Sequence, residues 1–269
     1  MRITTLGPEG TFSHAAAMKH DKNASILFVN TIRDVFEAVA KNKADFGVVP
    51  VENSIAGTIG QTLDLLMEFK LRISAEEILP ISHNLAGFGR ISDIKILYLH
   101  PQTYEQCELF IKKNLPKAEI MQTSSNGKSA GIVAKAKDKS KASIIPKTAA
   151  GIYKLKVLKR DVQDSRFNVT RFLVVGNTDS KKTGYDRTSI AIYPQIDRPG
   201  LLYDMLGEFA KRNINLTKIE SRPSKGRLGD YVFCIDFQGH RTEKNAAEAL
   251  KKLEKSFFVS IFGSYPRKY

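Results

Sequence analysis

The chain has 269 residues, 42% of them hydrophobic, and a formal net charge of +14. This length suits one large or two modest domains with real cores, and the apolar content is ordinary for a globular protein. No apolar run is long enough to span a membrane, the N-terminus resembles a strand instead of a signal peptide, and the two cysteines lie far apart. These features argue against a disulfide scaffold and predict a cytoplasmic protein without a membrane partner.

The positive charge is compatible with nucleic acid and with a small dianionic substrate. The lysines are scattered, however, and the densest stretch, residues 135–141, reads as the solvated end of a helix followed by a turn. Basic and aromatic residues do not interleave there as they do in RNA-recognition surfaces. We therefore expect no nucleic-acid partner.

Strand-like and helical runs alternate through the first two-thirds of the chain. Thr31 can cap a helix together with Asp34, and Pro101 suits the first turn of a helix over residues 102–115. This alternation predicts an α/β domain with largely parallel sheets. The expected strands are residues 3–6, 46–49, 94–99, 120–122, 143–145 and 172–175.

A polar run at residues 177–184 breaks this pattern and is interpreted as an interdomain linker. After it, two helical stretches alternate with four strand-like stretches in the order βαββαβ, which is the ferredoxin-like arrangement. The expected strands are 188–193, 216–221, 231–237 and 259–262, and the expected helices are 199–212 and 243–257.

Three segments crowd small or hydroxyl residues at the ends of expected strands: Gly7–His14, Val49–Ser54 and Asn168–Phe172. Such residues let backbone and hydroxyl donors approach an oxygen-rich ligand, and strand ends are where α/β folds bind ligands. In this order, and together with His100-Pro101-Gln102 and Gln106-Cys107, they resemble the signature segments of the prephenate dehydratase family. Residues 198–202 and 218–223 are similar to the two ligand-binding segments of phenylalanine-responsive ACT domains.

The resemblance implies an α/β protein with a two-lobed catalytic domain like the type 2 periplasmic binding proteins, followed by a ferredoxin-like βαββαβ ACT domain. The catalytic domain is expected at 1–178, with lobes of about 1–76 with 158–177 and of 77–157, and the ACT domain at 188–269. Because no chorismate mutase segment precedes Met1, we expect a monofunctional enzyme.

The family's reaction is loss of water and carbon dioxide from prephenate to give phenylpyruvate. The resemblance implies that Thr170 is catalytic and donates a hydrogen bond to the leaving hydroxyl. It implies no cofactor, and the histidines show no metal-binding spacing, so no metal is expected. The residues expected to bind substrate are Thr11, Ser13, Glu52, Asn53, Ser54, Gln106, Asn168, Arg171 and Phe172.

Several of these residues also have a structural interpretation. Ser13 can cap the helix it begins, Glu52 can act as a helix N-cap, and Asn168 suits a turn. Alternation along the strand places Arg171 opposite Thr170, so Arg171 is as compatible with bracing the crossover between lobes as with holding a carboxylate. His14 next to Ser13 has no triad geometry by spacing alone.

For regulation, the resemblance implies a homodimer or homotetramer that is inhibited by L-phenylalanine at the ACT domain. The alternative for Ser221–Pro223 is a turn into the next hairpin. Four features depart from the family pattern: Leu99, the segment Ser124–Ser129, Leu201 and Tyr203. Arogenate dehydration and a non-enzymatic small-molecule sensor stay open as alternative functions. The expected effector-binding residues are Gly200, Leu201, Leu202, Glu220, Ser221 and Arg222.

Overall fold

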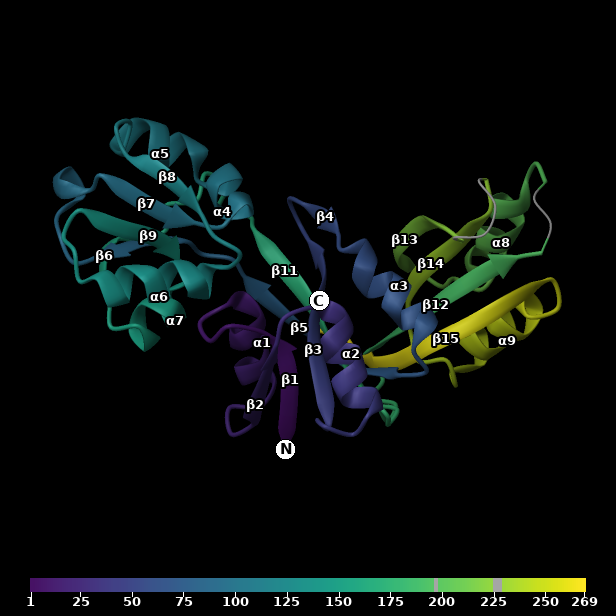
Figure 1. Cartoon of the computed structure of the whole chain (residues 1–269). Helices are drawn as coiled ribbons and strands as arrows, with labels where there is room; N and C mark the ends of the chain where they lie inside the picture. Colours follow the sequence, from purple (N-terminus) through teal and green to yellow (C-terminus); the bar gives the residue numbers. More distant parts are fainter. Residues whose placement is uncertain (196–197, 225–228) are drawn as a thin grey trace. The chain divides into compact units, whose positions relative to one another are not determined.

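The computed structural model describes residues 1–195, 198–224 and 229–269. Its first sheet has the strand order β2-β1-β3-β11-β5, and the short β4 pairs with β3 (Figure 1). Strands β1 and β2 are parallel, whereas β3 and β4 are antiparallel. The strands are β1 (Arg2–Leu6), β2 (Ser25–Val29), β3 (Phe46–Asn53), β4 (Gly57–Thr58), β5 (Arg72–Pro80) and β11 (Val169–Gly176).

Three helices belong to this part of the chain: α1 (Phe12–His20), α2 (Ile32–Ala40) and α3 (Gly60–Glu68). The cap expected before α2 is present. The Asp34 backbone N–H donates to Thr31 Oγ1 at 3.1 Å, and the Thr31 N–H donates to the Asp34 carboxylate at 3.0 Å. Two otherwise unpaired donors at the helix start are thereby satisfied.

The second sheet has the order β10-β6-β9-β7-β8. Strand β7 is parallel to β8 and β9, but β6 is antiparallel to β9 and β10, so the sheet is mixed and the expectation of largely parallel pairing is wrong for this half. Its strands are β6 (Asn84–Gly87), β7 (Ile96–Leu99), β8 (Glu119–Gln122), β9 (Lys141–Ile145) and β10 (Lys156–Lys159), and a short 3-10 helix, η1 (Ile91–Asp93), precedes β7.

Helices α4 (Pro101–Gln106) and α5 (Glu108–Asn114) cover one face of this sheet, and α6 (Asn126–Ala136) and α7 (Lys147–Ile152) cover the other (Figure 1). Leu97 and Leu99 pack with the α4–α5 layer, whereas the intervening Tyr98 packs with the α6–α7 layer. Side chains alternate across a strand, so both faces of these strands must be apolar.

The helix expected over residues 102–115 is interrupted. Cys107, with φ −128° and ψ 16°, ends α4 and precedes α5. Cys107 and Ile111 nevertheless both face the core, as the apolar pattern predicts. The break between the helices places Gln106 at the end of α4, beside the crossover strand β11.

The C-terminal segment forms one antiparallel sheet with the order β13-β14-β12-β15, and both of its helices lie on one face (Figure 1). This confirms the βαββαβ arrangement. Met205 and Phe209 of α8 and Leu250 of α9 form a core with Ile190 and Ile235 of the sheet. The elements are β12 (Asp186–Pro194), α8 (Leu201–Ala210), β13 (Leu216–Pro223), β14 (Tyr231–Gln238), α9 (Lys244–Leu253) and β15 (Phe257–Pro266).

The chain divides into two compact units whose limits differ from the linker-based boundary. One unit comprises residues 1–35, 48–58 and 78–172, and the other comprises 36–47, 59–77 and 173–269. The second unit therefore joins the βαββαβ segment to α3 and to the first part of β5. The domain limits expected from the sequence stay a prediction.

Within this second unit, β15 approaches β5 closely. A Cβ added at Gly263 would lie 2.3 Å from the backbone oxygen of Ile73, so only glycine fits there. Arg222 of β13 also forms an ion pair with Asp64 of α3 at 2.8 Å. The βαββαβ segment is thus tied to the preceding part of the chain by backbone packing and by charge.

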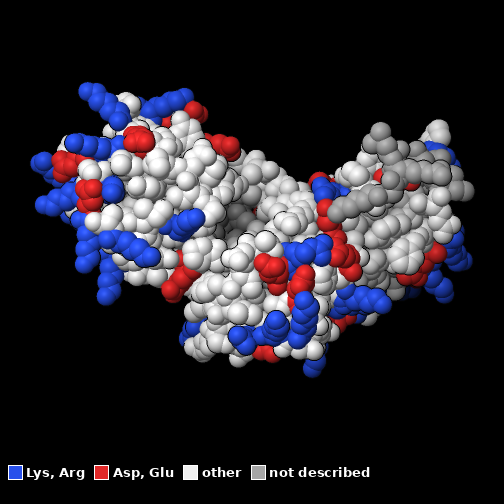
Figure 2. Space-filling view, in the orientation of Figure 1, with Lys and Arg blue, Asp and Glu red and all other residues white. Residues whose placement is uncertain are grey.

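Lys and Arg side chains are spread over the lobe that contains the second sheet, with Asp and Glu among them (Figure 2). On the face shown, this lobe carries dispersed charge and no uniform basic stripe. Among the helices of the described residues, none is both long and apolar enough to cross a bilayer.

Candidate active site

A chain of hydrogen-bonded amides leads to Thr170 at the start of β11. The Asn53 Nδ2 group donates to Thr170 Oγ1 at 2.9 Å and to Asn168 Oδ1 at 2.7 Å. The orientation of the Asn53 amide is fixed because its Oδ1 accepts the backbone N–H groups of Ile55 at 3.0 Å and Ala56 at 2.8 Å. The Thr170 oxygen is therefore an acceptor toward Asn53, and its own proton is left for another acceptor. Among the described residues, no group accepts this proton.

The chain of hydrogen bonds continues from Asn168 to Gln106, in the lobe that contains the second sheet. Asn168 Nδ2 donates to Gln106 Oε1 at 2.9 Å, and this oxygen also lies 2.8 Å from His83 Nε2. Asn168 is only 2% exposed and lies in neither a helix, a strand nor a turn, so the turn interpretation of this residue is wrong. The structure thus brings together four of the expected residues, Asn53, Gln106, Asn168 and Thr170, and adds His83.

His83 was not identified from the sequence as a site residue. Its imidazole is 2% exposed and lies edge-on to the ring of Phe12, with 5.4 Å between the ring centroids. Burial lowers the pKa of His83, and the hydrogen bond to Gln106 raises it by less, so the ring is neutral at neutral pH. The available sequence signal was weak, because the hydrogen-bonding partner is 23 positions away.

Ser54 holds the backbone around Thr170, and Arg171 pairs with Glu52 of β3. Ser54 Oγ donates to the carbonyl of Phe167 at 2.9 Å and accepts the Val169 N–H at 3.0 Å. Arg171, 4% exposed, lies 3.8 Å from the carboxylate of Glu52, nitrogen to oxygen. Glu52 belongs to β3 and therefore caps no helix, which corrects that alternative.

Three other expected site residues also have structural positions. Phe172, 1% exposed, lies on β11 and is part of the core. Thr11, and not Ser13, is the N-cap of α1: its Oγ1 accepts the His14 N–H at 3.1 Å and donates to the carbonyl of Leu6 at 3.0 Å. Ser13 lies inside the first turn of α1 and is buried.

The loop before α1 packs tightly against helices of the second sheet. A Cβ on Gly127 of α6 would lie 2.5 Å from the Glu9 carbonyl, and one on Gly10 would lie 3.0 Å from the Cβ of Ala149 in α7. Tyr153 also donates to the Glu9 carbonyl at 3.3 Å. Glycines at these positions permit the close approach of the loop.

Two of the four departures from the family pattern, Leu99 and the segment Ser124–Ser129, have local explanations. Leu99 is fully buried in the α4–α5 core. Ser125 accepts the Lys128 N–H at 3.1 Å and so caps α6, while Ser129 is buried beneath it. Within residues 1–195, 198–224 and 229–269, no three His, Cys, Asp or Glu side chains are arranged to hold a metal ion.

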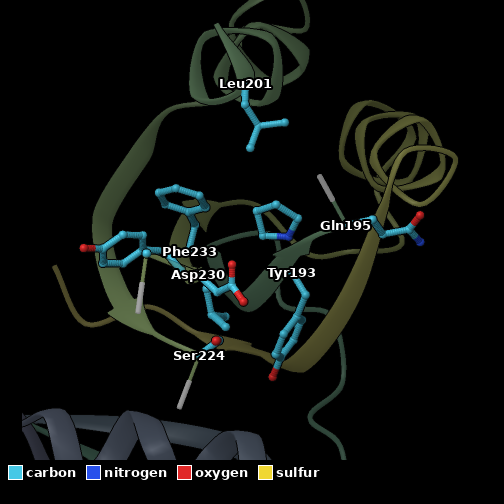
Figure 3. A pocket seen from close by; sticks show the side chains of 10 residues that line it. Tyr193, Gln195, Leu201, Ser224, Asp230 and Phe233 are labelled. Carbon is cyan, nitrogen blue, oxygen red and sulfur yellow. The ribbon is translucent and has the colours of Figure 1, made fainter. Parts of the chain in front are cut away.

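The βαββαβ segment contains a second candidate site. A pocket of about 200 Å³ lies at the start of α8, where Leu201 points toward Phe233 (Figure 3). Gly200 has φ 79°, a left-handed conformation, and precedes the first helical residue. The remaining described lining residues are Tyr193, Pro194, Gln195, Ser224, Gly229, Asp230, Tyr231 and Val232.

Only one of the expected effector residues, Leu201, is among the lining residues of this pocket. Leu202 and Ser221 are exposed, and Arg222 turns toward Asp64. Residues 221–223 belong to β13, where they pair with residues 231–233 of β14, so the turn interpretation of this segment is wrong. Glu220 lies on the same strand.

Fold and site together define a two-lobed α/β enzyme domain, with polar side chains gathered where the crossover strand begins, followed by a ferredoxin-like regulatory domain. Residues 3–180 match the model of the family described as prephenate dehydratase, and residues 195–255 match the ACT domain model. The chain belongs to the prephenate dehydratase family.

Relatives and solved structures agree with this assignment. A bifunctional chorismate mutase/prephenate dehydratase of Aquifex aeolicus is 42% identical over 99% of this chain and 74% of its own length. The prephenate dehydratase of Methanocaldococcus jannaschii is 41% identical over 96% of both chains. A crystal structure of prephenate dehydratase from Arthrobacter aurescens in complex with L-Phe superposes with a TM-score of 0.91 and is 34% identical, covering 99% of this chain and 90% of the other.

Proposed function

We propose that this chain converts prephenate to phenylpyruvate, carbon dioxide and water, and that Thr170 acts on the leaving hydroxyl. The proposal is supported above all by the direction of one hydrogen bond. Because the Asn53 amide donates to Thr170 Oγ1, the Thr170 proton is free to point at a substrate oxygen. A hydroxyl that accepts one hydrogen bond also becomes a better donor in the next one.

The reaction makes modest demands on the protein. The bond from the ring to its carboxylate breaks, carbon dioxide leaves, and the released electron pair completes the aromatic ring as the ring hydroxyl departs. The departing oxygen accumulates negative charge and takes up a proton to become water. A donor aimed at that oxygen stabilises the transition state, and one such donor is worth about 3 kcal/mol. With a pKa far above neutrality, a threonine serves better as a hydrogen-bond donor or relay than as a free acid.

Asn168, Gln106 and Asn53 then serve to hold this donor in place. The Asn53 amide is fully hydrogen-bonded within the protein, whereas the second N–H groups of Asn168 and Gln106 are available to substrate oxygens. Ser54 uses both its proton and its oxygen on the backbone beside β11, so we assign it to positioning the strand. For Thr11, Ser13, Glu52, Arg171 and Phe172, substrate contact stays a prediction.

The direct test is turnover by the purified chain in excess chelator, with phenylpyruvate followed by its ultraviolet absorbance. We expect product from prephenate without added metal or cofactor. Arogenate, which carries an amine in place of the side-chain keto group, is assayed in parallel and fixes the substrate preference. Absence of aromatic product from both substrates would contradict the proposal and favour a small-molecule sensor.

We further propose that L-phenylalanine inhibits the enzyme through the ACT domain of a cytoplasmic homodimer or homotetramer. The match of residues 195–255 to the ACT model supports this, as does the position of Gly200 at the start of α8 beside the pocket. Free backbone N–H groups at a helix start favour a carboxylate, and glycine allows close approach. The inhibition would follow from a shift between two conformations of the catalytic domain.

Titration of phenylalanine against activity tests this regulatory proposal with a matched pair of variants. Gly200→Val places a β-branched side chain at φ 79° and is expected to weaken inhibition strongly. Gly207→Ala, inside helix α8 and with no atom within 4 Å of the added Cβ, is expected to keep the inhibition. Equal inhibition of both variants and the parent would place the effector elsewhere.

A further inference from the structure

We propose that His83 is a positioning residue of the active site, which orients the hydroxyl of Thr170 through the amides of Gln106, Asn168 and Asn53. This inference rests on the proposed function of Thr170. It assigns a role to a buried histidine that the motifs do not single out. Its basis is a hydrogen-bond chain in which each amide has a single permitted orientation.

The hydrogen-bond chain is fixed at its Asn53 end by backbone N–H groups. Two N–H groups, those of Ile55 and Ala56, donate to Asn53 Oδ1, so the Nδ2 of Asn53 must face Asn168 and Thr170. Asn168 consequently presents its oxygen to Asn53 and its Nδ2 to Gln106. Since Nδ2 is a donor only, the Gln106 atom that faces it must be the oxygen.

At the His83 end of the hydrogen-bond chain, the orientation of the Gln106 amide determines which ring nitrogen of His83 carries the proton. Gln106 Oε1 cannot donate, and it lies 2.8 Å from His83 Nε2, so Nε2 carries the proton. His83 Nδ1 then has no proton, and this buried atom has no hydrogen-bond partner among the described residues. A neutral ring protonated at Nε2 is therefore the form that completes the chain.

His83 is held both at its ring and at its backbone. The Phe12 ring contacts it edge-on, and the backbone N–H of His83 donates to Gln163 Oε1 at 2.9 Å. Phe12 belongs to the Gly7–His14 segment, which gives this motif a function beyond capping α1. Without the Nε2–H donor, Gln106 Oε1 keeps only its bond from Asn168 Nδ2, so the Gln106 side chain and the end of the hydrogen-bond chain that it anchors are held less firmly.

Two substitutions of His83 distinguish the effect of losing the hydrogen-bond donor from the effect of losing the volume of the ring. His83→Gln can place its amide nitrogen near the position of Nε2 and keep a donor toward Gln106. His83→Leu fills the space without any donor. We expect His83→Leu to lower kcat by about tenfold or more while KM changes less than about threefold, because the loss falls on the donor that acts in the transition state. We expect His83→Gln to restore kcat to within about threefold of the parent.

A second buried histidine supplies the control. His240 is 4% exposed, lies in the ACT domain, and hydrogen-bonds Thr242 at 2.8 Å. His240→Leu should lower the melting temperature without changing kcat for prephenate. A kcat that falls equally in His83→Gln and His83→Leu, or that is unchanged in His83→Leu, would overturn the proposal.

A measurement on the parent protein completes the test without any substitution. Nitrogen-15 NMR of the histidine rings is expected to show His83 neutral and protonated at Nε2 in the free enzyme. A ring protonated at Nδ1 instead would overturn the proposal even if the enzyme turns over prephenate. Turnover by the parent tests the function of the chain separately, so the two failures are distinguishable.

Discussion

Replacing Thr170 by valine is expected to lower kcat by about two orders of magnitude or more, with KM within a few-fold of the parent value. Valine keeps the shape and the β-branching of the side chain, so strand β11 is undisturbed, but it offers no donor to the leaving hydroxyl. The hydrogen bond from Thr170 forms mainly as charge develops on the departing oxygen. Its loss therefore lowers kcat more than it changes KM. Steady-state kinetics with prephenate measures both constants.

A matched variant is available on a nearby strand. Thr5 of β1 is fully buried, whereas Thr170 is 8% exposed, and the Thr5 hydroxyl donates to the carbonyl of Val48 at 2.8 Å. Thr5→Val removes a buried threonine hydroxyl from the same sheet and should cost stability while leaving kcat near the parent value. If Thr170→Val instead raises KM with kcat intact, Thr170 is a binding residue and its assigned role is wrong.

Breaking the ion pair between Glu76 and Arg187 is expected to reduce the free energy of unfolding by about 3 to 5 kcal/mol. Arg187 Nη1 lies 2.7 Å from the Glu76 carboxylate, and both side chains are completely buried. Arg187→Met leaves Glu76 as a buried charge without its guanidinium partner, although the Lys268 backbone N–H still donates to it at 2.9 Å. Denaturant unfolding followed by circular dichroism gives the change.

An exposed pair and a double substitution make this test specific. The pair Lys41–Glu37 has the same 2.7 Å separation, but its side chains are 60% and 38% exposed, so Lys41→Met should cost less than about 1 kcal/mol. Glu76→Leu combined with Arg187→Met removes both buried charges and should recover most of the loss. Equal costs for the buried and exposed pairs would show that burial does not set the strength of this contact.

The sequence predicted elements well where the pattern was local, but in the first two-thirds of the chain it missed β2, β4, β5, β6 and β10. Thr31 and Asp34 are three residues apart and form the cap that their spacing indicates. The alternation of Leu97, Tyr98 and Leu99 reports a strand buried on both faces. The break at Cys107 escaped prediction because the apolar period continues across it: Cys107 and Ile111 both face the core on either side of the interruption.

The site was predictable as a set of residues but not as an arrangement. Motifs identified Asn53, Gln106, Asn168 and Thr170, yet the bonds among them join positions up to 117 residues apart. No local pattern determines which way such an amide points, because its orientation is set by donors and acceptors on other elements. His83 escaped for the same reason, since its partner belongs to a helix of the second lobe.

The close packing of β15 on β5 affects how a fragment without the C-terminal segment would behave in solution. β5 is the last strand of its sheet, Gly263 lies against the backbone of Ile73, and Arg72 donates to the carbonyl of Ile261. A fragment that ends within residues 177–184 would lack β15, so the edge of β5 and the side chain of Glu76 would become exposed. Uncovered strand edges recruit strands from other chains. Such a fragment should therefore self-associate, which makes the regulatory segment a cover against aggregation as well as a sensor.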